Sequence, residues 1–105
     1  MSAKPISFGW RLFFDQSVHF MAVLDLDGAI LAINKAALEM TGTREDDLVG
    51  RAFWDASFWP DRVEAEGVCR DAFTVVRSGR AHRQDATHVT ASGVKIVVDF
   101  SVAPF

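Results

Sequence analysis

The sequence predicts an α+β domain in which an antiparallel sheet carries helices on one of its faces. Three observations lead to this prediction. One hairpin pattern lies near the N-terminus, over residues 21–34, and a second lies near the C-terminus, over residues 81–103. Between them, residues 62–78 show the 3–4 residue apolar spacing of a long amphipathic helix. Hairpins at both ends with helices between them favour helices gathered on one face of the sheet.

Size and composition limit the classes of protein to be considered. The chain has 105 residues, half of them hydrophobic, which suits one domain with one core. The net charge is −3 and no basic stripe is present, so we expect no nucleic-acid partner. Because no apolar run approaches ~18 residues and no signal-peptide pattern is found, we expect a cytoplasmic domain without membrane contact. A single Cys excludes an internal disulfide and a cysteine-based zinc site, and no metal site is predicted.

The N-terminal segment is predicted as a leader followed by a short helix. Pro5 and Gly9 disfavour an early helix, so residues 1–9 are set apart as a leader from a domain over residues 10–105. An amphipathic helix is predicted before Phe20. Its apolar positions are Trp10, Phe13, Phe14 and Val18.

Two alternating patterns, over residues 21–25 and 29–34, predict the first pair of strands. Asp27-Gly28 between them is a strong hairpin signal, because glycine reaches positive φ without steric cost. We therefore expect a tight antiparallel hairpin at this point.

This hairpin is predicted to lead directly into a short helix. Asn34 is suited to the N-cap, since its side-chain oxygen accepts from the free N–H groups of the first turn. Gly42 is typical of the left-handed residue that ends a helix. Thr43 followed by Asp46 resembles a capping box, which predicts another helical turn that Gly50 closes.

The middle of the chain contains an aromatic segment and the longest helix. Residues 53–60 read FWDASFWP and are too short and irregular to predict as helix or strand. The long helix is predicted over residues 62–78, with Asp61 as N-cap and Gly79 as its end, lying across the sheet. Its apolar stripe consists of Ala65, Val68, Cys69, Ala72, Phe73 and Val76.

The second hairpin is predicted over residues 81–90 and 94–103, with Ser92-Gly93 at its turn. Its second strand alternates regularly, so its two faces differ in chemistry. One face carries Ile96, Val98, Phe100 and Val102, and the other carries Lys95, Val97, Asp99 and Ser101.

In their order and spacing, these elements resemble a PAS domain of the kind common in bacterial sensor proteins. The likeness covers residues 10–105 and rests on V-L-D-L-D-G-A-I-L-A-I-N-K-A-A, T-G-x-x-x-x-D-L-V-G-R, F-W-D-A-S-F-W-P and V-V-D-F-S-V-A-P. It implies a curved antiparallel sheet with helices on one face. It also implies a non-catalytic sensory, regulatory and dimerisation module of a signal-transduction protein, such as a two-component histidine kinase with a downstream effector domain.

The sequence departs from the family at its C-terminal end. The family has a fifth strand in the middle of the sheet, between the strands at 21–25 and 94–103, whereas the given sequence ends at Phe105 before such a strand. Three arrangements are open: a gap in the sheet, filling by a segment such as residues 5–12 of this or a neighbouring chain, or direct pairing of the two hairpins. We expect altered pairing or oligomerisation, hence a homodimer or strand-exchanged oligomer, and a parent protein that continues past Phe105.

The residues argue against three cofactors that the resemblance brings into consideration. Haem in many PAS sensors binds a His of the long helix, and residues 61–78 contain none; His82 and His88 are expected at the surface or rim. LOV-type flavin sensors use a Cys ahead of that helix, whereas Cys69 lies inside it and is expected to be a small buried hydrophobe. Photoactive-yellow-type chromophores need a Tyr, which the chain lacks. Cofactor and signal remain open.

The aromatic segment has two interpretations, as core or as the wall of a pocket for a small apolar ligand. The core interpretation is favoured, because large rings fill cavities before they line them. The pocket candidates are Met21, Ile33, Phe53, Trp54, Phe58, Trp59, Cys69, Phe73 and Phe100. The dimer-interface candidates are Trp10, Phe13 and Phe14.

A small enzyme with a curved sheet is the alternative function. It would use Asp99 with His82 or His88 as an acid–base pair in a hydrophobic cavity. The strand pattern predicts instead that Asp99 faces away from the helices, with Arg11 or Arg83 as a suggested ion-pair partner. Asp99 on the solvent side would remove the alternative.

Overall fold

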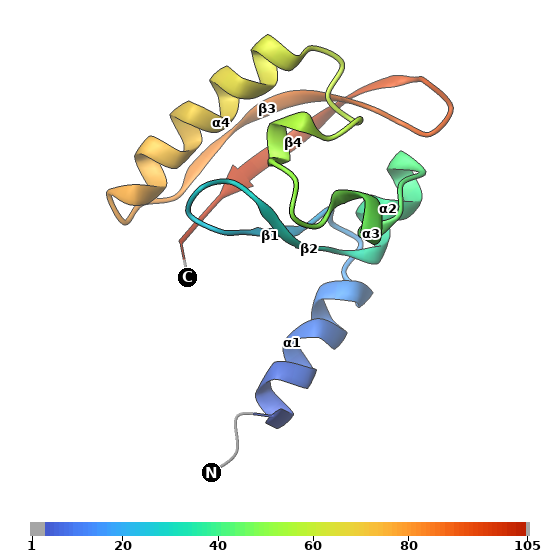
Figure 1. The fold of residues 1–105 in the computed structure, drawn as a ribbon, viewed down its shortest axis with the longest axis vertical. Coiled ribbons are helices and arrows are strands. Elements are labelled where there is room, and N and C mark those ends of the chain that lie inside the picture. Colours follow the sequence, from blue (N-terminus) through green and yellow to red (C-terminus); the bar gives the residue numbers. More distant parts are fainter. Residues whose placement is uncertain (1–3, 105) are drawn as a thin grey trace.

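The computed structural model describes residues 4–104 (Figure 1). Its elements are α1 (Lys4–Gln16), β1 (Ala22–Leu24), β2 (Ile30–Ile33), α2 (Lys35–Thr41), α3 (Glu45–Leu48), the 3-10 helix η1 (Phe53–Asp55), α4 (Arg62–Arg77), β3 (His82–Val89) and β4 (Lys95–Val102). Two antiparallel hairpins with helices between them confirm the predicted α+β class.

Helix α1 projects away from the rest of the fold (Figure 1) and begins earlier than predicted. It starts at Lys4 and runs without a break across the predicted leader boundary, so the expectation that Pro5 and Gly9 prevent an early helix is wrong. Pro5 lies in the first turn, where its missing N–H would have no partner within the helix. Gly9 costs the helix about 1 kcal/mol relative to Ala, which a longer helix with tertiary contacts tolerates.

The first hairpin, β1–β2, forms as predicted. Its turn is held by Asp25, whose Oδ1 accepts from the backbone N–H groups of Asp27 and Ala29, both at 2.9 Å. Gly28 has φ 88°, and a Cβ at this position would lie 2.5 Å from a ring carbon of Trp54. Conformation and space therefore both require glycine, and the turn sits close against the aromatic segment.

Helix α2 has the predicted ends. Asn34 is its N-cap and accepts from the backbone N–H of Ala37 at 3.2 Å. Gly42 ends it in the left-handed conformation, with φ 66°. The N-cap residue and the terminal glycine were therefore sufficient to predict where this helix begins and ends.

The capping box predicted for α3 is wrong. Arg44, rather than Thr43, is the N-cap, and no side chain caps the helix. The Thr43 hydroxyl is instead 2.8 Å from the Thr41 hydroxyl, so a neighbouring side chain competes for the predicted cap.

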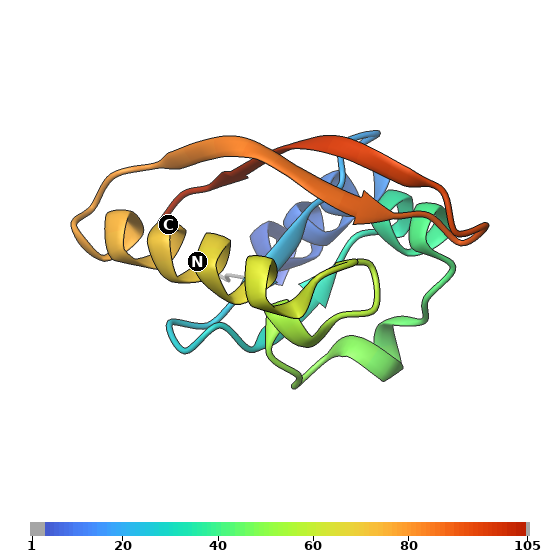
Figure 2. The same ribbon diagram turned by 90° about the horizontal axis from the view of Figure 1, so that it is seen from above.

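Helix α4 and the β3–β4 hairpin confirm their predictions. Asp61 caps α4 by accepting from the N–H groups of Val63 at 2.9 Å and Glu64 at 3.2 Å. β3 and β4 pair in unbroken antiparallel register, from His82 opposite Val102 to Val89 opposite Lys95. Figure 2 shows α4 lying along this hairpin.

The two hairpins do not join into the single sheet that the sequence predicted. Within residues 4–104, β1 pairs only with β2, and β3 only with β4. Direct pairing of the hairpins is therefore wrong, and residues 5–12 lie in α1 rather than in a strand that fills the gap. β1 has only three residues and a register shift at Val23/Leu24. It therefore offers few backbone hydrogen-bonding groups in register for pairing with the eight-residue strand β4. β1 and β4 each keep an unpaired edge.

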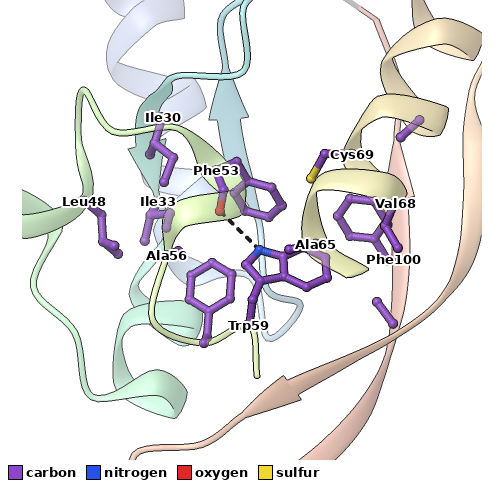
Figure 3. Packing of buried hydrophobic residues seen from close by; sticks show 13 residues of the cluster. Ile30, Ile33, Leu48, Phe53, Ala56, Trp59, Ala65, Val68, Cys69 and Phe100 are labelled. Carbon is purple, nitrogen blue, oxygen red and sulfur yellow. Dashed lines mark hydrogen bonds between the residues drawn. The ribbon is translucent and has the colours of Figure 1, made fainter. Parts of the chain in front are cut away.

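One hydrophobic core lies between α4, the aromatic segment and the inner faces of both hairpins (Figure 3). Because strand side chains alternate, β4 gives this core Phe100 and turns Lys95, Val97, Asp99 and Ser101 outward. The buried cluster consists of Ile30, Ile33, Leu48, Phe53, Ala56, Phe58, Trp59, Ala65, Val68, Cys69, Ala72, Ala86 and Phe100.

Candidate functional site: an aromatic core and the joint of α1

The nine predicted pocket residues divide into three groups. Trp54 and Phe73 are half-buried at the edge of the core, in an edge-to-face pair with ring centroids 6.2 Å apart. Met21 lies outside the core, 44% exposed. The buried group consists of Ile33, Phe53, Phe58, Trp59, Cys69 and Phe100.

The buried rings pack against one another. Phe53 is central, with ring centroids 5.6 Å from Phe58, 5.7 Å from Trp59 and 6.0 Å from Phe100. The Trp59 indole N–H donates to the Phe53 carbonyl oxygen at 3.1 Å, so its polar atom is satisfied inside the cluster (Figure 3). This arrangement is that of a packed core, while the role of these residues in ligand binding stays a prediction.

His88 is the residue that sequence analysis misplaced. It is only 9% exposed, not at the surface, and lies among rings, with centroids 4.8 Å from Phe58 and 4.6 Å from Trp59. Burial lowers the pKa of His88 from 6.5 to about 4. The signal was present in the strand, because His88 has the same inward parity as buried Ala86.

Cys69 has the environment expected of a small hydrophobic residue. It is fully buried in the core, and burial raises the pKa of its thiol to about 12. The thiol therefore stays protonated at neutral pH and is a poor nucleophile.

An open groove of about 410 Å³ lies beside the core, between the β1–β2 turn and α4. Trp54 and Phe73 provide its apolar surface. Arg77 Nη2 donates to the Leu26 carbonyl oxygen at 2.8 Å and ties the turn to α4. The remaining lining residues are Asp27, Glu66 and Arg70.

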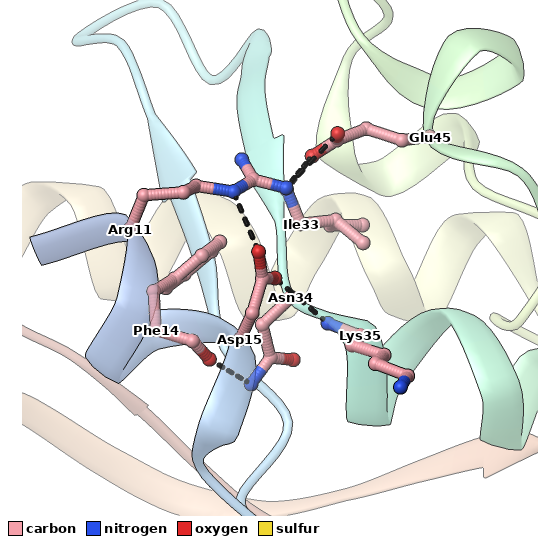
Figure 4. Close-up of polar contacts among 7 residues, drawn as sticks. All are labelled: Arg11, Phe14, Asp15, Ile33, Asn34, Lys35 and Glu45. Carbon is pink, nitrogen blue, oxygen red and sulfur yellow. Dashed lines mark hydrogen bonds and ion pairs between the residues drawn. The ribbon is translucent and has the colours of Figure 1, made fainter. Parts of the chain in front are cut away.

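A polar joint centred on buried Asn34 connects α1 to the body of the domain (Figure 4). Asn34 is fully buried, and its Nδ2 donates to the carbonyl oxygens of Phe14 at 2.9 Å and His19 at 2.7 Å. Its Oδ1 accepts from the N–H groups of Met21 at 3.0 Å and Ala37 at 3.2 Å. One side chain thus joins α1, the segment between α1 and β1, and α2, with every donor and both acceptor positions used.

Arg11 provides the second part of the α1 joint. Its Nη2 is 3.0 Å from both carboxylate oxygens of Glu45, and its Nε donates to Asp15 at 2.8 Å (Figure 4). Glu45 also accepts from the backbone N–H of Ile33 at 3.0 Å. Sequence analysis missed this contact, because Arg11 and Glu45 are 34 positions apart and no local pattern links them.

The interface candidates on α1 separate by exposure. Trp10 is 45% exposed and Phe13 76% exposed. Phe14 is buried against Trp10, with ring centroids 5.2 Å apart, so it offers little surface to a partner in this conformation, and its role in an interface stays a prediction. Leu12 is also exposed, which sequence analysis did not single out.

The alternative acid–base pair is not assembled. Asp99 lies on the outer face of β4 and pairs with Arg83, whose hydrogen bond lowers the pKa of that carboxyl. His82 is 2.7 Å from Gln84, and His88 faces the core on the opposite side of the hairpin from Asp99. The enzyme alternative based on these residues is therefore removed.

Comparison with known proteins agrees with this geometry. The family model described as the PAS fold matches residues 14–105. The sensor histidine kinase TmoS of Ectopseudomonas mendocina is 32% identical over 96 residues, which are 90% of this chain and 10% of that protein. Hybrid signal transduction histidine kinase D of Dictyostelium discoideum is 30% identical over 96 residues, again 90% of this chain but 6% of that protein.

A solved structure shows the same fold. A domain of a sensory box sensor histidine kinase/response regulator from Geobacter sulfurreducens matches 99% of this chain and 88% of its own, with TM-score 0.79 and 19% identity.

The chain spans about a tenth or less of the length of the curated relatives it matches. Among the helices of residues 4–104, none is long and apolar enough to cross a membrane. The chain belongs to the PAS fold family and is a sensory module of signal transduction.

Proposed function

We propose that this domain is a cytoplasmic, non-catalytic sensor that dimerises through α1 and acts on a histidine kinase or similar effector. The observation that carries the proposal is the exposure of Trp10 and Phe13, which lie three positions apart on one face of α1, with Leu12 also exposed on this helix. Neighbouring exposed aromatic side chains can form an apolar patch of the kind that marks an interaction site. Histidine kinases among the relatives support the choice of effector.

The joint of α1 gives this face a defined orientation. Asn34 and Arg11 attach α1 to α2 and α3, and Glu45 connects Arg11 to the end of β2. A change in packing around α2 or α3 therefore reaches α1 through directional hydrogen bonds. Two packings that differ in free energy by a few kcal/mol would be enough to bias a dimer interface.

Sedimentation equilibrium of the 105-residue chain tests the interface. We expect Phe13→Ser to weaken self-association by about tenfold or more, because a large ring leaves the interface. Leu26→Ser is the matched control, since Leu26 is also 76% exposed but lies in the β1–β2 turn. Equal association constants for the two variants, or a wild-type chain that stays monomeric at millimolar concentration, would contradict the proposal.

The signal proposed for this sensor is a small apolar molecule bound at the aromatic core. Half-buried Trp54 and Phe73 support an entry point between the β1–β2 turn and α4. Native mass spectrometry and an absorbance spectrum of the purified chain test this part. A co-purifying small molecule supports it, whereas an empty, colourless chain with no thermal shift against metabolites, haem or flavins argues for dimerisation alone.

A further inference from the structure

We propose that His88 is an acid-sensitive latch that holds the aromatic segment, residues 53–60, against β3 only while its imidazole is neutral. This inference concerns the core and does not depend on the dimer interface. Two independent features carry it: the position of the ring between two aromatic side chains, and a buried ring nitrogen that lacks a hydrogen-bond partner.

His88 forms the contact between β3 and the aromatic segment. Its ring packs against Phe58 and Trp59, which are consecutive aromatic residues near the end of that segment. At the next position of β3, the Val89 N–H donates to the Phe58 carbonyl oxygen at 2.8 Å. The imidazole and this backbone bond together close the segment over the core.

The closed arrangement suits only the neutral imidazole. His88 Nε2 is buried and has no partner among the residues that the structure describes. A neutral ring accommodates this by placing its acceptor nitrogen there, whereas an imidazolium carries an N–H on both nitrogens. An unpaired buried charge is costly, and attraction between the cation and the two rings offsets only part of that cost.

Among the side chains of residues 10–104, no carboxylate forms a hydrogen bond or ion pair with His88. In the aromatic segment, Asp55 pairs with Arg62 at 2.9 Å, and Asp61, which follows that segment, caps α4. On the hairpin, Asp85 of β3 and Lys95 of β4 are exposed on the outer face. The charged residues of α4 lie off its buried stripe and are Arg62, Glu64, Glu66, Arg70, Asp71 and Arg77.

Protonation therefore requires the ring to reach water. With a folded pKa of about 4 and an ordinary value of 6.5, the open or unfolded form takes up the proton first as pH falls. The contribution of the neutral His88 ring to stability is fully present above pH 6.5 and is lost progressively between pH 6.5 and pH 4. At pH 5 the equilibrium moves toward the open form by about 30-fold.

Denaturant unfolding of the 105-residue chain, followed by Trp fluorescence from pH 7.5 to pH 4, tests the latch. We compare wild type with His88→Phe, which keeps a ring but cannot titrate, and with His82→Gln as a control that removes a histidine of the same strand. We expect wild type and His82→Gln to lose about 30-fold more in the unfolding equilibrium constant at pH 5 than His88→Phe. The same pH dependence in all three would overturn the proposal.

Direct titration keeps the test independent of the variant's folding. NMR of wild type should show one histidine with a pKa near 4 and, at pH 5, loss of amide protection in residues 53–60 relative to α4. A His88 pKa near 6.5, or unchanged protection of residues 53–60, would also overturn the proposal. If His88→Phe fails to fold, His88→Leu replaces it in the pH comparison.

Discussion

Different interactions hold the joint of α1 and the core beneath the β3–β4 hairpin together. At the joint, Asn34 makes four hydrogen bonds and Arg11 pairs with both oxygens of Glu45. In the core, Phe53 and Trp59 contact other rings and share one hydrogen bond. Hydrogen bonds are directional and costly to leave half-made, whereas apolar contacts are not directional. The joint therefore fixes the direction of α1, and the core provides most of the stability.

The largest predicted effect is in the core. Trp59→Ala removes the ring contacts with Phe53, Phe58 and His88 and the bond to the Phe53 carbonyl. We expect the free energy of unfolding to fall by about 3–5 kcal/mol, measured by urea denaturation. Trp10→Ala is the matched control, and its half-exposed ring should cost far less. Equal losses would mean that α1 and the core are stabilised in the same way.

The next effect is at the joint. Asn34→Ala leaves the carbonyl oxygens of Phe14 and His19 and the N–H groups of Met21 and Ala37 without their partner. We expect a loss of about 2–3 kcal/mol in urea denaturation, because buried polar groups are left unsatisfied. Asn34→Ser retains only the helix cap and should recover part of this loss. A loss below about 0.5 kcal/mol for Asn34→Ala would show that water replaces the amide.

A smaller effect is expected from the second part of the joint. Glu45→Gln removes the negative charge of the carboxylate whose two oxygens accept from Arg11 Nη2. It keeps an acceptor for the Ile33 N–H. We expect a loss of about 1 kcal/mol, reduced by added salt, because the pair is partly exposed. Glu39→Gln, at a more exposed pair with Lys35 at 3.8 Å, is the control and should cost less. A loss that salt does not reduce would argue against an electrostatic contribution.

The smallest effect is expected on the outer face of the second hairpin. The side chains of the Arg83–Asp99 pair are largely exposed, so Asp99→Asn should leave the urea midpoint unchanged within error. Because the lowered pKa of Asp99 depends on Arg83, Arg83→Gln should raise that pKa toward its ordinary value, as measured by NMR. A large stability loss in Asp99→Asn would place this face in an interface.

Local patterns predicted the elements well, and long-range contacts account for what they missed. The stripe on α4, the alternation of β4 and the cap at Asn34 depend on neighbouring residues, so the sequence alone was enough. The Asn34 amide donates to the carbonyl oxygens of His19 and Phe14, which lie 15 and 20 positions earlier in the sequence. Arg11 and Glu45 are separated by 34 positions. Only the fold brings these groups together.

The remaining misses have a different cause. His88 was expected at the rim because histidine is usually exposed, yet its place on the inner face of β3 outweighed that preference. Pro5 and Gly9 were given too much weight as helix breakers. The hairpins were expected to join because the family fold has one sheet, whereas β1 is too short and irregular to pair with β4.

Amide hydrogen exchange of Asn34→Asp tests most directly whether the joint and the core are separate. This variant keeps an acceptor for Met21 and Ala37 but faces the Phe14 and His19 carbonyl oxygens with a carboxylate instead of an N–H donor. We predict that, at neutral pH, amides of α1 lose at least about tenfold more protection than those of α4, which lose only what the lower global stability of the variant causes. Equal loss of protection in α1 and α4, or wild-type protection in α1, would contradict a polar joint that attaches α1 independently of the core.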